Sequence, residues 1–166
     1  MILKRRLLLF SFIFLSLFGI ELNAGNLYWV QGSGSWNDGN HWSLVSGGKP
    51  AGVIPQASDN VIFDAFSFIS ENQSVTVSAE VACLNMTWQN VKKGSVLQGP
   101  VDAKLNIYGS LSFSADMANN FAGILFFKSV TSSSIFTAGK IFIGDIHFEG
   151  ENGSWLLKDN LKTADD

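Results

Sequence analysis

Aromatic side chains gather near the start of the chain, where Tyr28, Trp29, Trp36 and Trp42 lie in one short segment rich in Gly, Ser and Asn. Exposed rings of this kind stack on sugar rings, so these four residues are candidates for a ligand-binding aromatic platform. They also suit a hydrophobic cap over the first turn of a repeat fold, with the indole N–H groups bonded to loop carbonyls. A repeat fold needs a cap, so the sequence favours the cap and keeps the platform as the alternative. His41 in the same segment is expected to fix the loop through hydrogen bonds.

Carboxylates in and after this segment raise the question of a metal site. Asp38, Asp59 and Asp64 supply oxygen ligands that suit Ca²⁺. Their spacing does not match an EF-hand loop closed by a glutamate, and an Asx turn without metal explains Asp38 equally well. Asp59 and Asp64 flank a predicted strand and point to opposite faces, unlike the paired carboxylates of a glycoside hydrolase. We expect no cofactor, with Ca²⁺ at these three residues as the alternative.

Motifs for covalent or metal catalysis are absent from the sequence. It has no nucleophile elbow, no paired-histidine zinc motif and no glycine loop for phosphate. The single cysteine, Cys83, lies in an apolar stretch and is interpreted as a small buried residue. A reactive thiol or an intermolecular bridge is the alternative for an exported chain. We therefore expect a protein that is not an enzyme.

The elements that must position these residues are short strands. Apolar and polar residues alternate, β-branched and aromatic types dominate, and glycines punctuate the runs. No segment after residue 24 sustains the period of an amphipathic helix, which indicates an all-β protein. The clearest runs are 74–78, 84–88, 105–108, 111–113, 124–127, 141–143, 146–148 and 155–157.

The order of strands and corners favours a parallel β-solenoid, in which each turn consists of short strands joined at corners. Few connections show the tight two-residue turns of β-hairpins, although Asn152-Gly153 fits one. The repeat is degenerate, and the sequence does not define its period. A β-sandwich is the alternative.

Residues 1–24 have the three parts of a secretory signal peptide. Lys4, Arg5 and Arg6 are positive, residues 7–20 form an apolar run, and Ala24 precedes the expected cleavage site. The run is shorter than the roughly 20 residues that span a bilayer, so we expect cleavage and no stable membrane span. No cysteine follows the run for lipid attachment. The chain is expected to be exported, and secreted or at the cell surface.

The remaining part of the chain contains 8 Lys and no Arg, and the whole chain has a net charge of −3. It lacks the clustered basic residues that a nucleic-acid partner requires. Surface glycans or other cell-surface proteins are the partners that we expect.

The aromatic segment also resembles a known family. Its residues are Tyr28-Trp29-Val30-Gln31-Gly32-Ser33-Gly34-Ser35-Trp36-Asn37-Asp38-Gly39-Asn40-His41-Trp42-Ser43, followed by Pro55 and Asp59-Asn60-Val61-Ile62-Phe63-Asp64. This pattern is similar to the N-terminal module of large secreted or cell-surface β-repeat proteins of Bacteroidetes, which are adhesin-like and associated with type IX secretion. The chain departs from it at Gln31, where the family usually has glycine. The similarity continues through 83–88, 105–111 and 153–159.

The resemblance implies an exported, non-catalytic structural or adhesion-type module. A carbohydrate-binding module, or the remnant of a polysaccharide-acting β-helix enzyme, is the alternative. Members of this family are usually longer and carry a C-terminal sorting domain, so we expect a fragment, or a periplasmic protein if no such domain follows. The expected organisation is a signal peptide over 1–24, a Trp/Gly-rich cap segment over 25–68 and solenoid repeats over 69–166.

Overall fold

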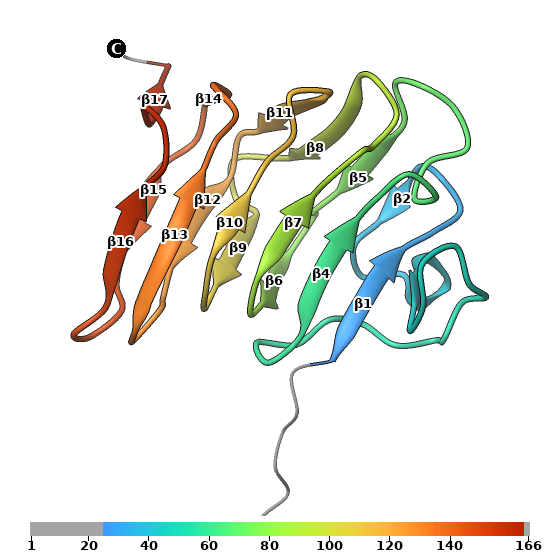
Figure 1. Cartoon of the computed structure of the whole chain (residues 1–166), viewed down its shortest axis with the longest axis horizontal. Helices are drawn as coiled ribbons and strands as arrows, with labels where there is room; N and C mark the ends of the chain where they lie inside the picture. The colour runs from blue at the N-terminus through green and yellow to red at the C-terminus, as the bar shows by residue number, and fades with distance from the viewer. Residues whose placement is uncertain (1–24, 165–166) are drawn as a thin grey trace, which may run out of the picture.

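The computed structural model describes residues 25–164, and the predicted signal peptide lies outside this range. The chain winds through three parallel sheets and forms a β-solenoid of about 5 turns (Figure 1). This confirms the all-β solenoid prediction and excludes the sandwich. One strand pair among the described residues is antiparallel, and it joins β1 (Asn26–Trp29) to β3 (Trp42–Ser43).

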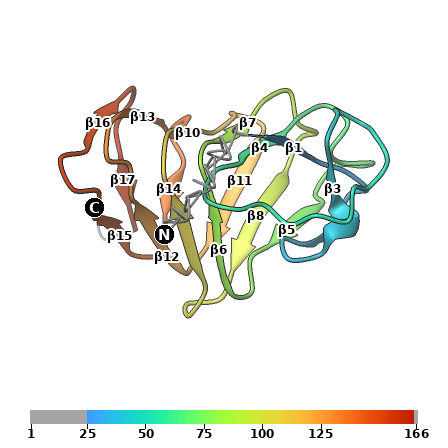
Figure 2. The same ribbon diagram turned by 90° about the horizontal axis from the view of Figure 1, so that it is seen from below.

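Each sheet collects one strand from successive turns of the chain. Sheet A contains β1 and β3 with β4 (Asn60–Phe63), β7 (Met86–Trp88), β10 (Leu111–Ser112), β13 (Ser132–Phe136) and β16 (Ser154–Leu157). Sheet B contains β2 (Gly34–Ser35), β5 (Ser74–Thr76), β8 (Ser95–Gly99) and β11 (Met117–Phe121). Sheet C contains β6 (Glu80–Cys83), β9 (Lys104–Ile107), β12 (Ile124–Phe127) and β15 (Ile146–Phe148). The pair β14 (Ile141–Phe142) and β17 (Lys162–Thr163) lies beyond β11. Viewed from below, the strands of sheet A follow one side of the molecule (Figure 2).

The register of sheet A defines the repeat that the sequence left open. The same inward position is occupied in successive turns by Val61, Met86, Leu111, Ile135 and Leu157, at intervals of 25, 25, 24 and 22 residues. The interval varies because the corners between strands differ in length. A fixed period is therefore absent from the sequence, although the strands themselves remain in register.

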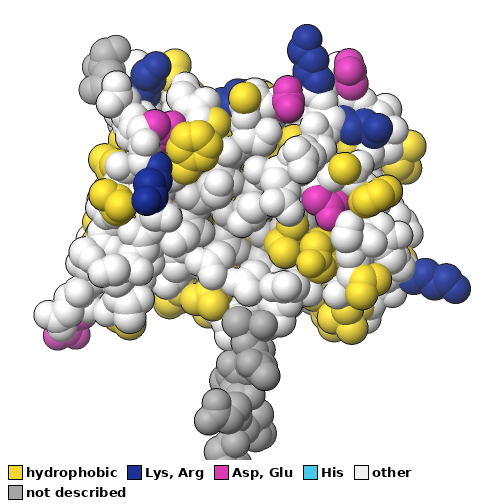
Figure 3. Space-filling model, in the orientation of Figure 1, with side chains coloured by type: hydrophobic (Ala, Val, Ile, Leu, Met, Phe, Trp, Pro, Cys, Tyr) yellow, Lys and Arg dark blue, Asp and Glu magenta, His cyan; other side chains and the backbone are white. Residues whose placement is uncertain are grey.

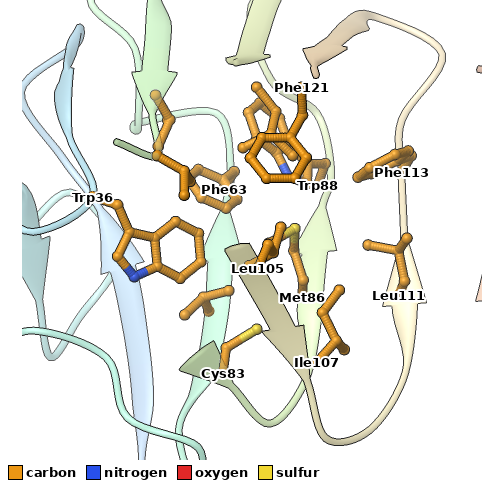
Figure 4. Close-up of a cluster of buried hydrophobic side chains, with 14 of the residues drawn as sticks. Trp36, Phe63, Cys83, Met86, Trp88, Leu105, Ile107, Leu111, Phe113 and Phe121 are labelled. Atoms are coloured by element: carbon orange, nitrogen blue, oxygen red, sulfur yellow. The ribbon is translucent and has the colours of Figure 1, made fainter. Parts of the chain in front are cut away.

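Alternation along each short strand sends every second side chain into the solenoid, where it stacks on its counterpart in the next turn. Cys83, Met86, Leu105 and Ile107 are all at most 1% exposed and form part of this continuous core (Figure 4). Because parallel strands lie about 4.8 Å apart, inward side chains of adjacent turns are in van der Waals contact. The core is thus one column of stacked apolar layers.

An aromatic cluster closes the N-terminal end of this column. Trp29, Trp36 and Trp42 are each 0% exposed and pack around Phe63. Phe63 in turn stacks on Trp88 with ring centroids 4.1 Å apart, so the cluster continues into the column. We call Trp29, Trp36, Trp42, Phe63 and Trp88 the aromatic cap.

The long connection between β2 and β4 completes this cap. After β2 the chain forms the 3-10 turn η1 (Gly39–His41) and then β3, which covers the outer edge of β1. Residues 44–59 lead from β3 to β4. The cap segment expected over 25–68 therefore already contains solenoid strands. The solenoid begins before residue 69, because β1, β2 and β4 pair in register with later turns.

The structure explains the preference for glycine at two positions of the cap segment. Gln31 has a φ of 67°, a left-handed conformation that favours glycine, and glycine is the residue that the resemblance leads us to expect there. A Cβ atom at Gly34 would overlap the ring of His41, so a larger residue at that position would displace the ring.

The C-terminal end of the column has no comparable cover among the described residues. Leu157 is 45% exposed although Ile135, one turn before it, is 0% exposed. Phe148 is 46% exposed although its counterpart Phe127 is 0% exposed. The two ends of the described solenoid are therefore different, one sealed and one open.

One local prediction was wrong. Asn152-Gly153 does not form a hairpin turn, because the strands on either side of it belong to sheets C and A and do not pair with each other. Asn152 has a φ of 59° and sits in a corner of the solenoid.

We predict that Trp36→Ala lowers the free energy of unfolding by about 3–5 kcal/mol, because it leaves a large cavity in the aromatic cap. Urea unfolding followed by circular dichroism measures the change. The matched control is Val101→Ala at a side chain that is 75% exposed, where the change should stay within about 0.5 kcal/mol. Equal, small changes in both variants would show that the cap does not stabilise the fold.

Candidate functional site

The structure corrects the prediction of a ligand-binding aromatic platform. The indoles of Trp29, Trp36 and Trp42 are fully buried, so they cannot stack on a ligand at the surface. For Trp29, alternation along β1 explains the difference, because Leu27 and Trp29 point inward whereas Tyr28 points outward, where it is partly exposed. The predicted capping role agrees with the burial of all three indoles.

Most of the expected hydrogen bonds of the cap are present. Trp29 Nε1 donates to the carbonyl of Gly32 at 2.6 Å, and Trp42 Nε1 donates to the carbonyl of Trp36 at 2.7 Å. Trp36 Nε1 is buried and has no acceptor among residues 25–164. His41 fixes the loop as expected, because its Nδ1 lies 2.9 Å from the carbonyl oxygen of Val30.

The three candidate calcium ligands lie in separate turns. The Asp38 carboxylate accepts a hydrogen bond from the backbone N–H of Asn40 at 2.9 Å, and this bond lowers its pKa. Asp64 accepts one from the hydroxyl of Ser46 at 2.6 Å, and Asp59 accepts one from the backbone of its own turn. No group of three or more His, Cys, Asp or Glu side chains that could hold a metal occurs in the part of the chain that the structure describes. The structure therefore does not bring the three candidate carboxylates together into one group.

The outer face of sheet A carries a hollow that is lined by residues of several successive turns. Its outward side chains form two rows along the solenoid. The first row is Asn26, Asn60, Asn85, Ser110, Ser134 and Leu156. The second row is Tyr28, Ile62, Thr87, Ser112, Phe136 and Lys158. A groove of about 620 Å³, hereafter the sheet A groove, runs over the middle of these rows.

The groove exists because small residues sit between larger ones. Thr87 and Ser112 are neighbours in the second row, with Ile62 on one side and Phe136 on the other. Three strand spacings separate Ile62 from Phe136, which is about 14 Å. In the space-filling view this face has a broad uncharged centre with apolar side chains on both sides (Figure 3).

The first row forms a ladder of hydrogen bonds that holds the floor of the groove in place. Asn60 Nδ2 donates to Asn26 Oδ1 at 2.9 Å, and Asn85 Nδ2 donates to Asn60 Oδ1 at 2.7 Å. The backbone N–H of Ser110 donates to Asn85 Oδ1 at 2.6 Å, and that of Ser134 donates to the hydroxyl of Ser110 at 3.0 Å. Each amide is oriented by its neighbour, so the polar surface is preorganised.

The chemistry of the groove is that of a binding surface. Its lining contains amides, hydroxyls and apolar side chains, and Lys158 at one end is its one charged residue. The hydroxyls of Thr87 and Ser112 make no hydrogen bond to other described residues, so they remain available to a ligand. The lining has no carboxylate, histidine or thiol that could act as an acid, base or nucleophile.

Sequence reasoning did not single out these residues. The signal was present as Asn85-x-Thr87 and Ser110-x-Ser112, which place small polar side chains on alternate positions of two strands. It becomes meaningful only when the register shows that the two strands are adjacent.

Comparison with known proteins gives no match to a family model, a curated protein or a solved structure. Within residues 25–164 there is no helix with the length and apolar character needed to span a membrane.

Cys83 lies in the core and not at a site. It is 0% exposed, which confirms its interpretation as a small buried residue, and burial raises the pKa of its thiol far above the ordinary value. The thiol is therefore protonated at physiological pH and weakly nucleophilic.

We predict that Cys83 of the folded protein does not react with a thiol reagent such as DTNB at pH 8, because the thiol is both protonated and covered. In urea the same protein should release one equivalent of thionitrobenzoate per chain. Rapid stoichiometric reaction without denaturant would contradict the described packing of the core.

Proposed function

We propose that this chain is a non-catalytic structural module of an exported protein and that it contacts its ligand through the sheet A groove. The observation that carries the proposal is the ordered, almost uncharged surface of the groove, which offers binding groups and no acid–base pair. A solenoid holds such a surface rigidly, because every strand beneath it is paired to its neighbours.

Export and display at the cell surface belong to the same proposal. They are supported by the positive and apolar residues of 1–24 and by the resemblance of the aromatic segment to modules of secreted Bacteroidetes proteins. The aromatic cap supplies a physical role for that segment, since it closes the first turn of the solenoid.

A carbohydrate-binding function is the second candidate, and one observation favours it. The groove combines free hydroxyls at Thr87 and Ser112 with the ring of Phe136, which is 41% exposed. Sugars are recognised by such a combination of hydroxyl or amide hydrogen bonds and apolar ring contact. In this candidate function the sugar would bind to the sheet A groove and not to the buried indoles. The remnant of a polysaccharide-acting enzyme is supported less well, because no pair of carboxylates lines the groove.

We predict that Ser112→Phe lowers the affinity of the protein for its surface ligand at least tenfold, because the new ring fills the groove. Binding to glycan arrays and to intact bacterial or host cells measures the effect. Ala118→Phe on the outward face of sheet B is the matched control and should bind like the wild type.

Treatment of the cells separates the two candidates. Periodate oxidation of surface sugars should abolish binding if the ligand is a glycan, whereas protease treatment should abolish it if the ligand is a protein. Unchanged binding of Ser112→Phe to every target would show that the sheet A groove is not the contact surface.

A further inference from the structure

The outward side chains of sheet A form a regular grid of hydrogen-bonding groups. Residues two positions apart on one strand lie about 7 Å apart, and equivalent residues of adjacent strands lie about 4.8 Å apart. The two rows that line the sheet A groove therefore present polar groups at fixed intervals. One row contributes Asn60, Asn85, Ser110 and Ser134, and the other contributes Thr87 and Ser112.

The hydroxyl groups of this grid keep unused hydrogen-bonding capacity. Those of Thr87, Ser112 and Ser134 make no hydrogen bond to other residues within 25–164, and the Ser110 hydroxyl accepts one bond but donates none there. A hydroxyl group rotates to donate or to accept. The grid therefore suits a ligand with hydroxyl groups of its own, each of which also donates and accepts.

The dimensions of the grid match those of sugar rings. A pyranose carries hydroxyl groups on opposite edges of its ring, so one ring that lies across the groove can contact both rows. Each residue of an extended glycan advances by about one strand spacing. Since three spacings separate Ile62 from Phe136, the groove accommodates about three sugar residues.

The groove offers no countercharge along its length. Lys158 is the one charged residue of its lining, and it lies at one end, beyond Phe136. An ionised carboxylate or phosphate in the middle of the groove would lose water without gaining a charged partner, which is unfavourable. A neutral glycan has no such cost, so the lining favours neutral over acidic sugars.

A protein ligand fits the groove less well than a glycan. Protein interfaces concentrate their affinity in apolar or aromatic anchors that enter a desolvated pocket. In the sheet A groove the outward apolar side chains, Ile62 and Phe136, stand at the two ends, and Thr87 and Ser112 between them are polar. The centre of the groove therefore provides hydrogen bonds and no pocket for an apolar anchor.

We propose that the sheet A groove binds a neutral, extended glycan of about three sugar residues, which lies across the strands with one ring against Phe136. The Phe136 ring is 41% exposed and stacks on the apolar face of a sugar, while the hydroxyl rows bind the edges of the rings. This inference rests on the proposed function, because it names the ligand class of the same groove.

Binding of the protein to linear oligosaccharides of one to six residues tests the inference. The series contains neutral chains of glucose, galactose, mannose, xylose or N-acetylglucosamine, together with chains of uronic acids. At least one neutral series should bind, with an affinity that rises at least tenfold from one residue to three and less than twofold beyond. Uronic acid chains should bind at least tenfold more weakly. Equal binding of neutral and acidic chains, or an affinity independent of length, would overturn the inference.

Variants at the ends of the groove provide a second measurement by calorimetric titration. Phe136→Ala should lower the affinity for the trisaccharide at least tenfold, whereas Phe136→Tyr retains the ring and should bind like the wild type. Phe66→Ala is the matched control, because its ring is 68% exposed but lies outside the groove, and it should also bind like the wild type. Circular dichroism verifies that each variant is folded.

Lys158→Met tests the neutral character of the ligand. It should leave the affinity for the trisaccharide and for cells within about twofold, since a neutral glycan gains little from a charge at the end of the groove. A tenfold loss of cell binding would show that the natural ligand is acidic, which would overturn the inference.

Cell binding of Ser112→Phe distinguishes a failure of this inference from a failure of the proposed function. If that variant loses binding to cells but no oligosaccharide binds to the wild type, the groove is still the contact surface and its ligand is not a neutral glycan. If the variant binds every target like the wild type, the groove is not the contact surface, and the proposed function and the inference are both wrong.

Discussion

The stacking of inward apolar side chains from one turn to the next is the interaction on which the rest of this structure depends. Val61, Met86, Leu111 and Ile135 occupy one such row, and each is at most 1% exposed. The row persists although the corners between strands vary in length, because the parallel ladders maintain the register and the corners absorb the differences. The strands have only 2 to 5 residues. Strands this short bury little surface alone, so neighbouring turns provide most of the stability.

Several features of the molecule follow from this dependence. A stack has two ends, and each end exposes a layer of core side chains unless something covers it. Three tryptophans cover the first end, and Phe148 and Leu157 are exposed in the last described turn. The same register also aligns outward side chains in rows, so that Thr87 and Ser112 become neighbours and form a hollow between larger side chains. The groove and the open end are thus both consequences of regular stacking, on its outer face and at its end.

Part of this could be predicted from the sequence. Alternating apolar residues and frequent glycines were sufficient to predict an all-β solenoid. The aromatic segment was sufficient to predict a cap. Burial of Trp29 follows from the alternation along β1, but that alternation does not say which of Tyr28 and Trp29 points inward until β1 is paired. The groove could not be predicted, because residues 25 positions apart become neighbours only once the register is known. The prediction of a hairpin turn at Asn152-Gly153 was wrong for the same reason, since the strands that flank it pair with other turns and not with each other.

Hydrogen exchange of the protein, followed by mass spectrometry of its peptides, tests the account of the stack most directly. If turns stabilise one another and the aromatic cap seals the N-terminal end, amides of β1, β4 and β7 beside the cap should exchange most slowly. Protection should then decrease toward β16 and β17 at the open end. Slow exchange in β16 and β17, equal to that of β4, would contradict the account, and so would exchange that begins at β1.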